Sequence, residues 1–116
     1  MAYDERLAER VREVLSGVDD VAELKMFGGL CHTVHGNMAV GVIRDDLLVR
    51  LGPDEADAEI GEPGVRAMEV GGRTSRGFLS VGPVATGSDA ALRAWIDRGV
   101  AYASSLPPKR PKPSKR

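Results

Sequence analysis

Short turn signals within residues 23–51 are the feature that most limits the folds open to this chain of 116 residues. They divide one apolar stretch into separate segments. The turn signals are Gly28-Gly29, Gly36-Asn37 and Asp45-Asp46, and Gly and Asn tolerate the positive φ angles that short hairpin turns require. Extended segments joined by such short turns pair in the antiparallel direction. We therefore expect an antiparallel meander, made of a short apolar run and three strands, and its segments are 23–26, 30–35, 38–43 and 47–51.

Helical periodicity marks both ends of the chain. Apolar residues recur at spacings of three and four in 3–16, and again in a segment that starts at Ser88 and ends near Ser105. Ser88 is a typical N-cap residue, and Pro107-Pro108 prevents the last helix from continuing.

A short helix and a second strand pair are predicted between the meander and the last helix. Pro53 suits the first turn of a helix, and the strand pair comprises residues 65–70 and 78–81. The resulting order, α-β-β-β-α-β-β-α, predicts an α+β fold in which helices pack on an antiparallel sheet. We expect residues 1–106 to form one domain.

The charge of the chain is concentrated at its C-terminal end. The net charge is −1, yet residues 107–116 contain five of the 16 basic residues and none of the 17 acidic ones. This Pro-rich, basic tail is predicted to be disordered, and it is where we expect nucleic-acid contact, if there is any. The residues that would contact phosphates are Lys109, Arg110, Lys112, Lys115 and Arg116.

The compartment is predicted from the cysteine and from hydropathy. Cys31 is the single cysteine, so no disulfide can form within the chain. The first residues are charged, and no apolar stretch approaches the roughly 20 residues that span a bilayer. We expect a cytoplasmic protein that does not contact membranes.

Several local strings resemble one known family. They are Lys25-Met26-Phe27-Gly28-Gly29, Gly36-Asn37-Met38-Ala39, Asp46-Leu47-Leu48-Val49-Arg50 and Leu92-Arg93-Ala94-Trp95. In their order and spacing, over about residues 5–106, they resemble the TfoX/Sxy N-terminal domain family. The resemblance implies a secretion-chaperone-like α+β fold, and the YjbR-type family is the nearest structural alternative. It also implies a regulator, because the named members control bacterial competence genes together with a transcription activator, and it supplies no catalytic residues and no cofactor.

Four basic residues form the candidate anion-binding set. They are Lys25, Arg50, Arg73 and Arg76, and the last two belong to the glycine-rich segment around 71–77. If this segment folds back over the sheet, the four side chains can converge on one carboxylate or phosphate, which arginine binds in a bidentate manner. The alternative is that each pairs with an acidic side chain or is solvated, and we favour that alternative.

Cys31, His32 and His35 are the weak candidates for metal ligands. In a strand, Cys31 and His35 share one face and His32 points to the other, which weighs against a shared ion. A zinc site also usually needs four ligands, or three and an open position. We therefore expect no metal and no cofactor. Nothing in the spacing provides a base beside Cys31, so we expect no catalytic residue either.

The sequence thus predicts a non-enzymatic regulatory or protein-interaction domain. The alternative function is binding of a small anion or small molecule by Arg50, Arg73 and Arg76. The expected partner is a protein, with the transcription machinery as a candidate class, and a homodimer is compatible with the pattern.

Overall fold

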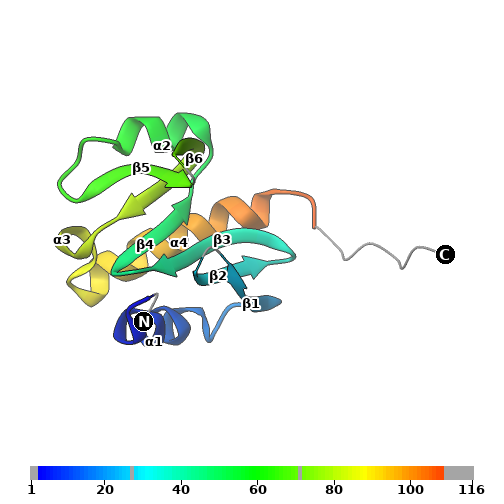
Figure 1. Ribbon diagram of the computed structural model, residues 1–116. Coiled ribbons are helices and arrows are strands. Elements are labelled where there is room, and N and C mark those ends of the chain that lie inside the picture. Colours follow the sequence, from blue (N-terminus) through cyan, green and yellow to red (C-terminus); the bar gives the residue numbers. More distant parts are fainter. Residues whose placement is uncertain (1–2, 27, 71, 109–116) are drawn as a thin grey trace.

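The structure, a computed structural model, describes residues 3–26, 28–70 and 72–108, and it contains one six-stranded antiparallel sheet (Figure 1). The helices are α1 (Glu5–Leu15), α2 (Pro53–Glu59), α3 (Pro83–Thr86) and α4 (Asp89–Ser105). The strands are β1 (Val21–Met26), β2 (Gly29–Val34), β3 (Asn37–Ile43), β4 (Asp46–Arg50), β5 (Val65–Val70) and β6 (Arg73–Val81). Their order in the sheet is β1-β2-β3-β4-β6-β5.

The predicted α+β fold class is confirmed, with two additions to the element order. The short apolar run at 23–26 belongs to a full strand, because β1 starts at Val21 and pairs with β2 over six residue pairs. A short helix, α3, starts at Pro83 directly after β6, where proline is favoured in the first turn.

Side chains cap the two long helices at their N-terminal ends, as their sequences favour. The Asp4 carboxylate accepts hydrogen bonds from the backbone N–H groups of Arg6 (2.8 Å) and Leu7 (3.1 Å) at the start of α1. The Ser88 hydroxyl accepts one from the N–H of Ala91 (3.1 Å) at the start of α4. Both caps satisfy backbone donors that a helix leaves unpaired.

The main core lies between one face of the sheet and helices α1 and α4. Every second residue of the central strands faces the helices and is fully buried, as Val40, Val49 and Leu79 are. Leu92 and Ile96 of α4 complete the same apolar cluster. Burying each large aliphatic side chain contributes roughly 1.5–3 kcal/mol, so this layer supplies most of the stabilisation.

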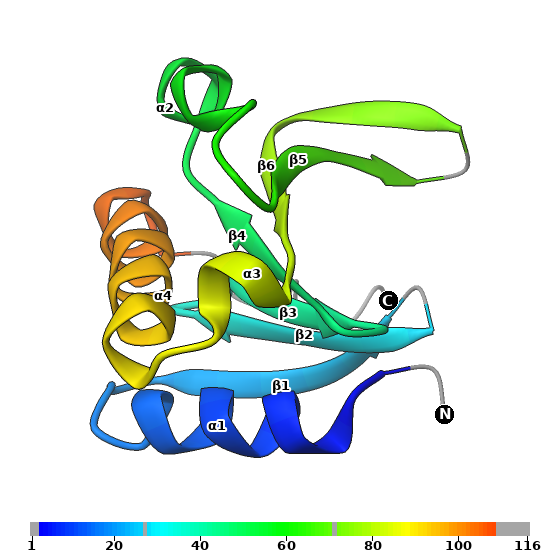
Figure 2. The same ribbon diagram turned by 90° about the vertical axis from the view of Figure 1, so that its left-hand side faces the viewer.

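The β5–β6 hairpin bends away from the rest of the sheet (Figure 2). The bend coincides with a shift in register, because Ala67 pairs with Leu79 whereas the next residue, Met68, pairs with Ser75. Gly77 lies in the unpaired stretch of β6 with φ +92°, and its carbonyl accepts hydrogen bonds from two backbone N–H groups after β4. A residue without a Cβ atom adopts this φ without strain.

No helix in the described ranges is long and apolar enough to cross a membrane.

Replacing Gly77 with alanine is expected to lower the free energy of unfolding by about 1–2 kcal/mol, because φ is positive there. The new Cβ would also lie 3.3 Å from the backbone of Gly52 and of Pro53. Chemical denaturation measures the loss.

Two other glycines serve as controls. At Gly61, φ is +104° but the space around a new Cβ is open, so Gly61→Ala measures the loss of stability due to backbone strain alone. At Gly17, the space is open and φ is not positive. The loss should decrease from Gly77 to Gly61 to Gly17, and equal losses at all three would contradict this account.

Candidate protein-interaction site

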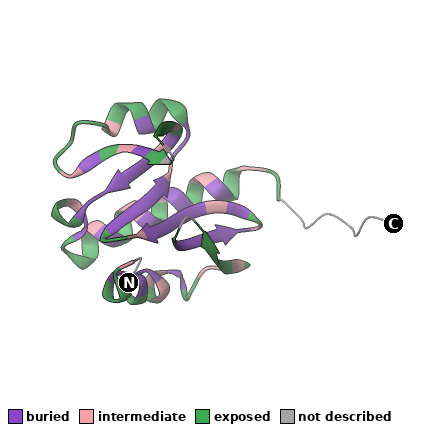
Figure 3. Cartoon of the chain, viewed as in Figure 1, coloured by how far each residue is buried: buried purple, intermediate pink, exposed green. Residues whose placement is uncertain are grey.

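Strand β1 forms one edge of the sheet and is its most exposed strand. It pairs with β2 along one side, from Val21 opposite Val34 to Met26 opposite Gly29, and no described strand pairs with its other side. Figure 3 shows β1 exposed beside the buried strands β2, β3 and β4. Its outer backbone N–H and C=O groups can therefore pair with an added strand.

Two large apolar side chains project from this edge strand. Leu24 is 48% exposed and Met26 is 40% exposed. Because side chains alternate along a strand, both lie on one face of the sheet, and Glu23 and Lys25 lie on the other. Among the described residues, the remaining exposed large apolar side chains are Ile60 and Val84, which lie far from β1 in the sequence.

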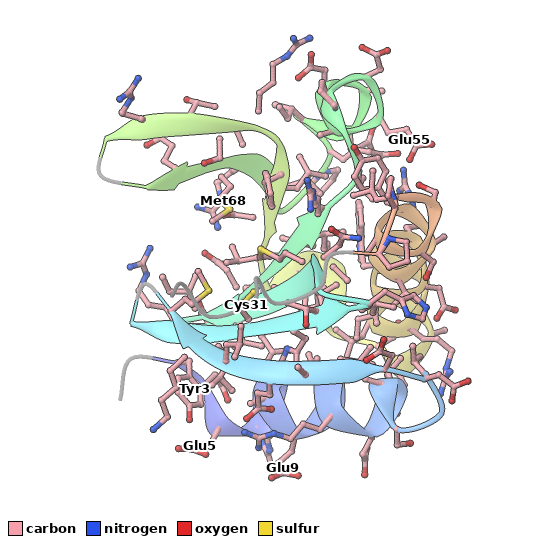
Figure 4. The ribbon with its side chains drawn as sticks, turned by 90° about the vertical axis from the view of Figure 1, so that its right-hand side faces the viewer. Tyr3, Glu5, Glu9, Cys31, Glu55 and Met68 are labelled. Atoms are coloured by element: carbon pink, nitrogen blue, oxygen red, sulfur yellow. The ribbon has the colours of Figure 1, made fainter. Side chains whose placement is uncertain are left out.

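The apolar side of β1 continues into a buried row of the sheet. Leu24 is opposite Cys31, Cys31 is opposite Gly41, and Gly41 is opposite Leu48. Cys31 and Leu48 are only 3% exposed. This face looks towards the β5–β6 hairpin, from which Met68 points back to the sheet (Figure 4).

The charged side of β1 is fixed to helix α1 through Glu23. The Arg12 guanidinium donates two hydrogen bonds to this carboxylate, from Nε to Oε1 (2.8 Å) and from Nη2 to Oε2 (3.0 Å). His32 Nε2 donates a third, over 3.0 Å to Oε1. His32 is 2% exposed, and its Nδ1 is buried without a partner in the described structure. A bidentate Arg–carboxylate pair restricts geometry, so it holds the edge strand in place.

These contacts shift the pKa values of the groups involved. The hydrogen bonds from Arg12, which dominate, and from His32 lower the pKa of Glu23 from 4.5 to about 2, although burial opposes this shift. Burial lowers the pKa of His32, although Glu23 favours its charged form. Glu23 is therefore ionised and His32 is neutral at physiological pH.

The candidate anion-binding residues do not form one cluster. Lys25 on β1 is separated from Arg50 on β4 by two strands, which is roughly 14 Å at the usual strand spacing. Arg73 is exposed at the first position of β6, next to the hairpin turn. Arg76 donates a hydrogen bond to Asp57 over 3.0 Å, as the alternative of pairing with an acidic side chain predicts.

Arg50 has two aromatic neighbours. Its Cζ atom lies 5.4 Å from the centre of the Phe78 ring and 5.5 Å from the centre of the Tyr102 ring. Such contacts stabilise a guanidinium by about 0.5–1 kcal/mol each at exposed sites. Anion binding by Arg50, Arg73 and Arg76 stays a prediction.

A second polar site was not predicted from the sequence. Arg44, Asp46, Arg66 and Glu69 line a groove of about 480 Å³ between the β3–β4 turn and the β5–β6 hairpin. Asp46 is 7% exposed and accepts a hydrogen bond of 2.8 Å from Arg66. The two residues are far apart in the sequence and meet because β4 and β5 both pair with β6, so no local signal marks them.

The candidate metal ligands are dispersed. Cys31 is buried within β2, and burial raises the pKa of its thiol. His35 lies beyond the end of β2, in a turn with φ +53°, and its Nδ1 is 3.0 Å from Asp20, so the prediction that the strand extends to His35 is wrong. The described residues include no group of three or more His, Cys, Asp or Glu side chains that could hold a metal ion.

The predicted nucleic-acid contacts lie outside the described residues. They are Lys109, Arg110, Lys112, Lys115 and Arg116.

Comparison with known proteins matches the chain to one family. A family model described as the TfoX N-terminal domain matches residues 13–103. No curated protein matches the chain, and no solved structure does.

The Glu23 contacts predict how stability depends on pH. The unfolded carboxyl group takes up its proton near pH 4.5 and the folded one near pH 2, so their stabilisation is complete above this range and is lost as the pH falls through it. Glu23→Gln should therefore lower the free energy of unfolding by about 1 kcal/mol at neutral pH, a value reduced for solvent screening because the side chain is 36% exposed. Denaturant unfolding across the acid range should also show a weaker pH dependence.

The matched control is Glu13→Gln, an exposed residue of helix α1, next to Arg12 in the sequence. It should keep the wild-type pH dependence between pH 4.5 and 2. An unchanged profile for Glu23→Gln would contradict the assigned role of this carboxylate.

Proposed function

Because the chain belongs to the TfoX N-terminal domain family, we propose that it is a regulatory domain that binds a protein partner and is not an enzyme. The observation that supports this proposal is the open edge of β1, with Leu24 and Met26 exposed beside it. The partner adds an extended segment to this edge. Backbone hydrogen bonds then supply affinity, and the apolar side chains supply specificity.

The anchoring of β1 favours this mode of binding. The Arg12–Glu23–His32 contacts hold the strand against α1 before a partner arrives. A strand that is already ordered loses little conformational entropy on binding, so more of the interaction energy appears as affinity.

The chemistry of the reactive groups supports a non-enzymatic role. Burial raises the pKa of Cys31, which disfavours the thiolate that a nucleophile requires. Glu23 and His32 also have shifted pKa values, and Glu23 accepts hydrogen bonds from both His32 and Arg12, so this contact connects β1, β2 and α1.

The regulatory part of the proposal follows from the family. Its named members control competence genes with a transcription activator, so we place the partner of this chain among cytoplasmic proteins of transcription regulation.

A pull-down with matched variants tests the proposal. Leu24→Asp places a charge at the edge, whereas Ile60→Asp changes a side chain of similar exposure, 45% against 48%, on another element. Immobilised wild-type protein and Ile60→Asp should retain the same partner from a lysate of the native cells, and Leu24→Asp should lose it. Mass spectrometry identifies what is retained.

Retention of the same partner by all three proteins would show that β1 is not the binding site. Recovery of no partner by the wild-type protein would count against a protein-interaction role.

A further inference from the structure

We propose that the segment bound at β1 is the β1 strand of a second copy of this chain. The two strands pair antiparallel about a two-fold axis that passes between Leu24 and Leu24 of the second copy, which we call an axis at Leu24. This inference rests on the proposed function, since it uses the same open edge, and it names the occupant. The result is one continuous sheet formed from the two six-stranded sheets. A two-fold contact of this kind closes on itself and leaves no further edge of β1 exposed.

The alternation of side chains limits the registers in which β1 can pair with itself. Residues directly opposite each other in an antiparallel pair lie on the same face of the sheet. A two-fold axis between two residues would place Glu23 or Lys25 beside an apolar side chain of the second copy. The axis must therefore lie where one residue is opposite the same residue of the second copy. The candidates near the middle of β1 are Glu23, Leu24 and Lys25.

Charge selects one of these three registers. An axis at Glu23 would place Glu23 opposite its own copy, and an axis at Lys25 would place two lysines opposite each other, which is unfavourable. With the axis at Leu24, Glu23 lies opposite Lys25 of the second copy, and the symmetry repeats this pair. Both charged pairs are then attractive, at about 0.2–1 kcal/mol each.

The apolar face agrees with the same register. Leu24 lies opposite Leu24 of the second copy, and Met26 lies opposite Ala22, so the two exposed apolar side chains of each copy become covered. The covered residues extend the row that already contains the buried Cys31 and Leu48.

The existing contacts of Glu23 leave the pairing possible. Its side chain remains 36% exposed while Arg12 and His32 hold the carboxylate, so it is accessible from the edge. The labelled acidic side chains of α1, Glu5 and Glu9, point away from the sheet (Figure 4). Glu9 accepts a hydrogen bond from Arg12 Nη1 over 3.2 Å, so its charge is paired with the same guanidinium that holds Glu23.

The proposed dimer interface is small, so we expect its affinity to be low. Stable interfaces bury about 800 Å² per partner, and a pair of six-residue strands buries less than that. The dimer should thus form reversibly as the protein concentration rises.

Sedimentation equilibrium over a range of concentrations tests the pairing. The wild-type mass should rise from 12.4 kDa towards twice that value. Lys25→Glu places two like-charged pairs in the interface, and Leu24→Asp places two carboxylates on the axis, so each should remain monomeric. The controls Arg93→Glu and Ile60→Asp, both at exposed positions, should dimerise like the wild type.

A cross-linking measurement tests the position of the axis without relying on a loss of binding. In a Cys31→Ala background, Leu24→Cys should form a disulfide between two copies under mild oxidation, because only the residue on the axis lies opposite itself. Met26→Cys and Ile60→Cys should cross-link much less. Equal cross-linking at the three positions would overturn the register.

The outcomes separate this inference from the proposed function. In one outcome, the wild-type protein stays monomeric at all concentrations, and Leu24→Asp fails to retain a partner protein that the wild type retains in the pull-down. This result would refute the self-pairing and support the partner site. In that result Lys25 and Glu23 act as edge charges that prevent self-association. A dimer that Leu24→Asp abolishes, with retention of a different partner unchanged, would support the self-pairing and refute the partner site at β1.

Discussion

The close packing of α4 on β3 is the contact on which the rest of the structure depends. A Cβ atom on Gly99 would lie 2.6 Å from the carbonyl oxygen of Ala39 and 2.9 Å from a methyl group of Val40, so only glycine permits this approach. At this distance, Leu92 and Ile96 enter the core without leaving space between helix and sheet. The helices thereby occupy one face of the sheet and leave its edge at β1 open.

The open edge is ordered because polar contacts replace the missing second strand neighbour. β1 has one strand partner, and Arg12 of α1 holds its Glu23 by a bidentate pair. The same carboxylate satisfies His32, a buried residue of β2. One acidic side chain thus links three elements, which explains how a strand with exposed side chains stays aligned with the sheet.

Sequence reasoning succeeded where local signals are strong and failed where distant segments meet. The helix cap at Ser88 was predicted, and the structure contains it. The turn predicted at Gly36-Asn37 lies one residue earlier, at His35-Gly36, where both φ angles are positive, and Asn37 starts β3. The arginine set was different, because separation along the chain says nothing about which strands become neighbours. Strand β6 inserts next to β4, so Arg50 meets Phe78 and the convergence imagined for Lys25 is absent.

Sequence alone determined the alternation of charged and apolar residues in Glu23-Leu24-Lys25-Met26, because strand geometry converts spacing directly into faces. The register that we propose for self-pairing depends on this alternation. Tertiary structure alone decided that this strand is an edge. A strand of this composition can lie inside a sheet or at its border, and the difference depends on which segments pair on each side. That outcome is set by long-range packing, here of β4 on β6 and of α1 against β1, and no local pattern encodes it.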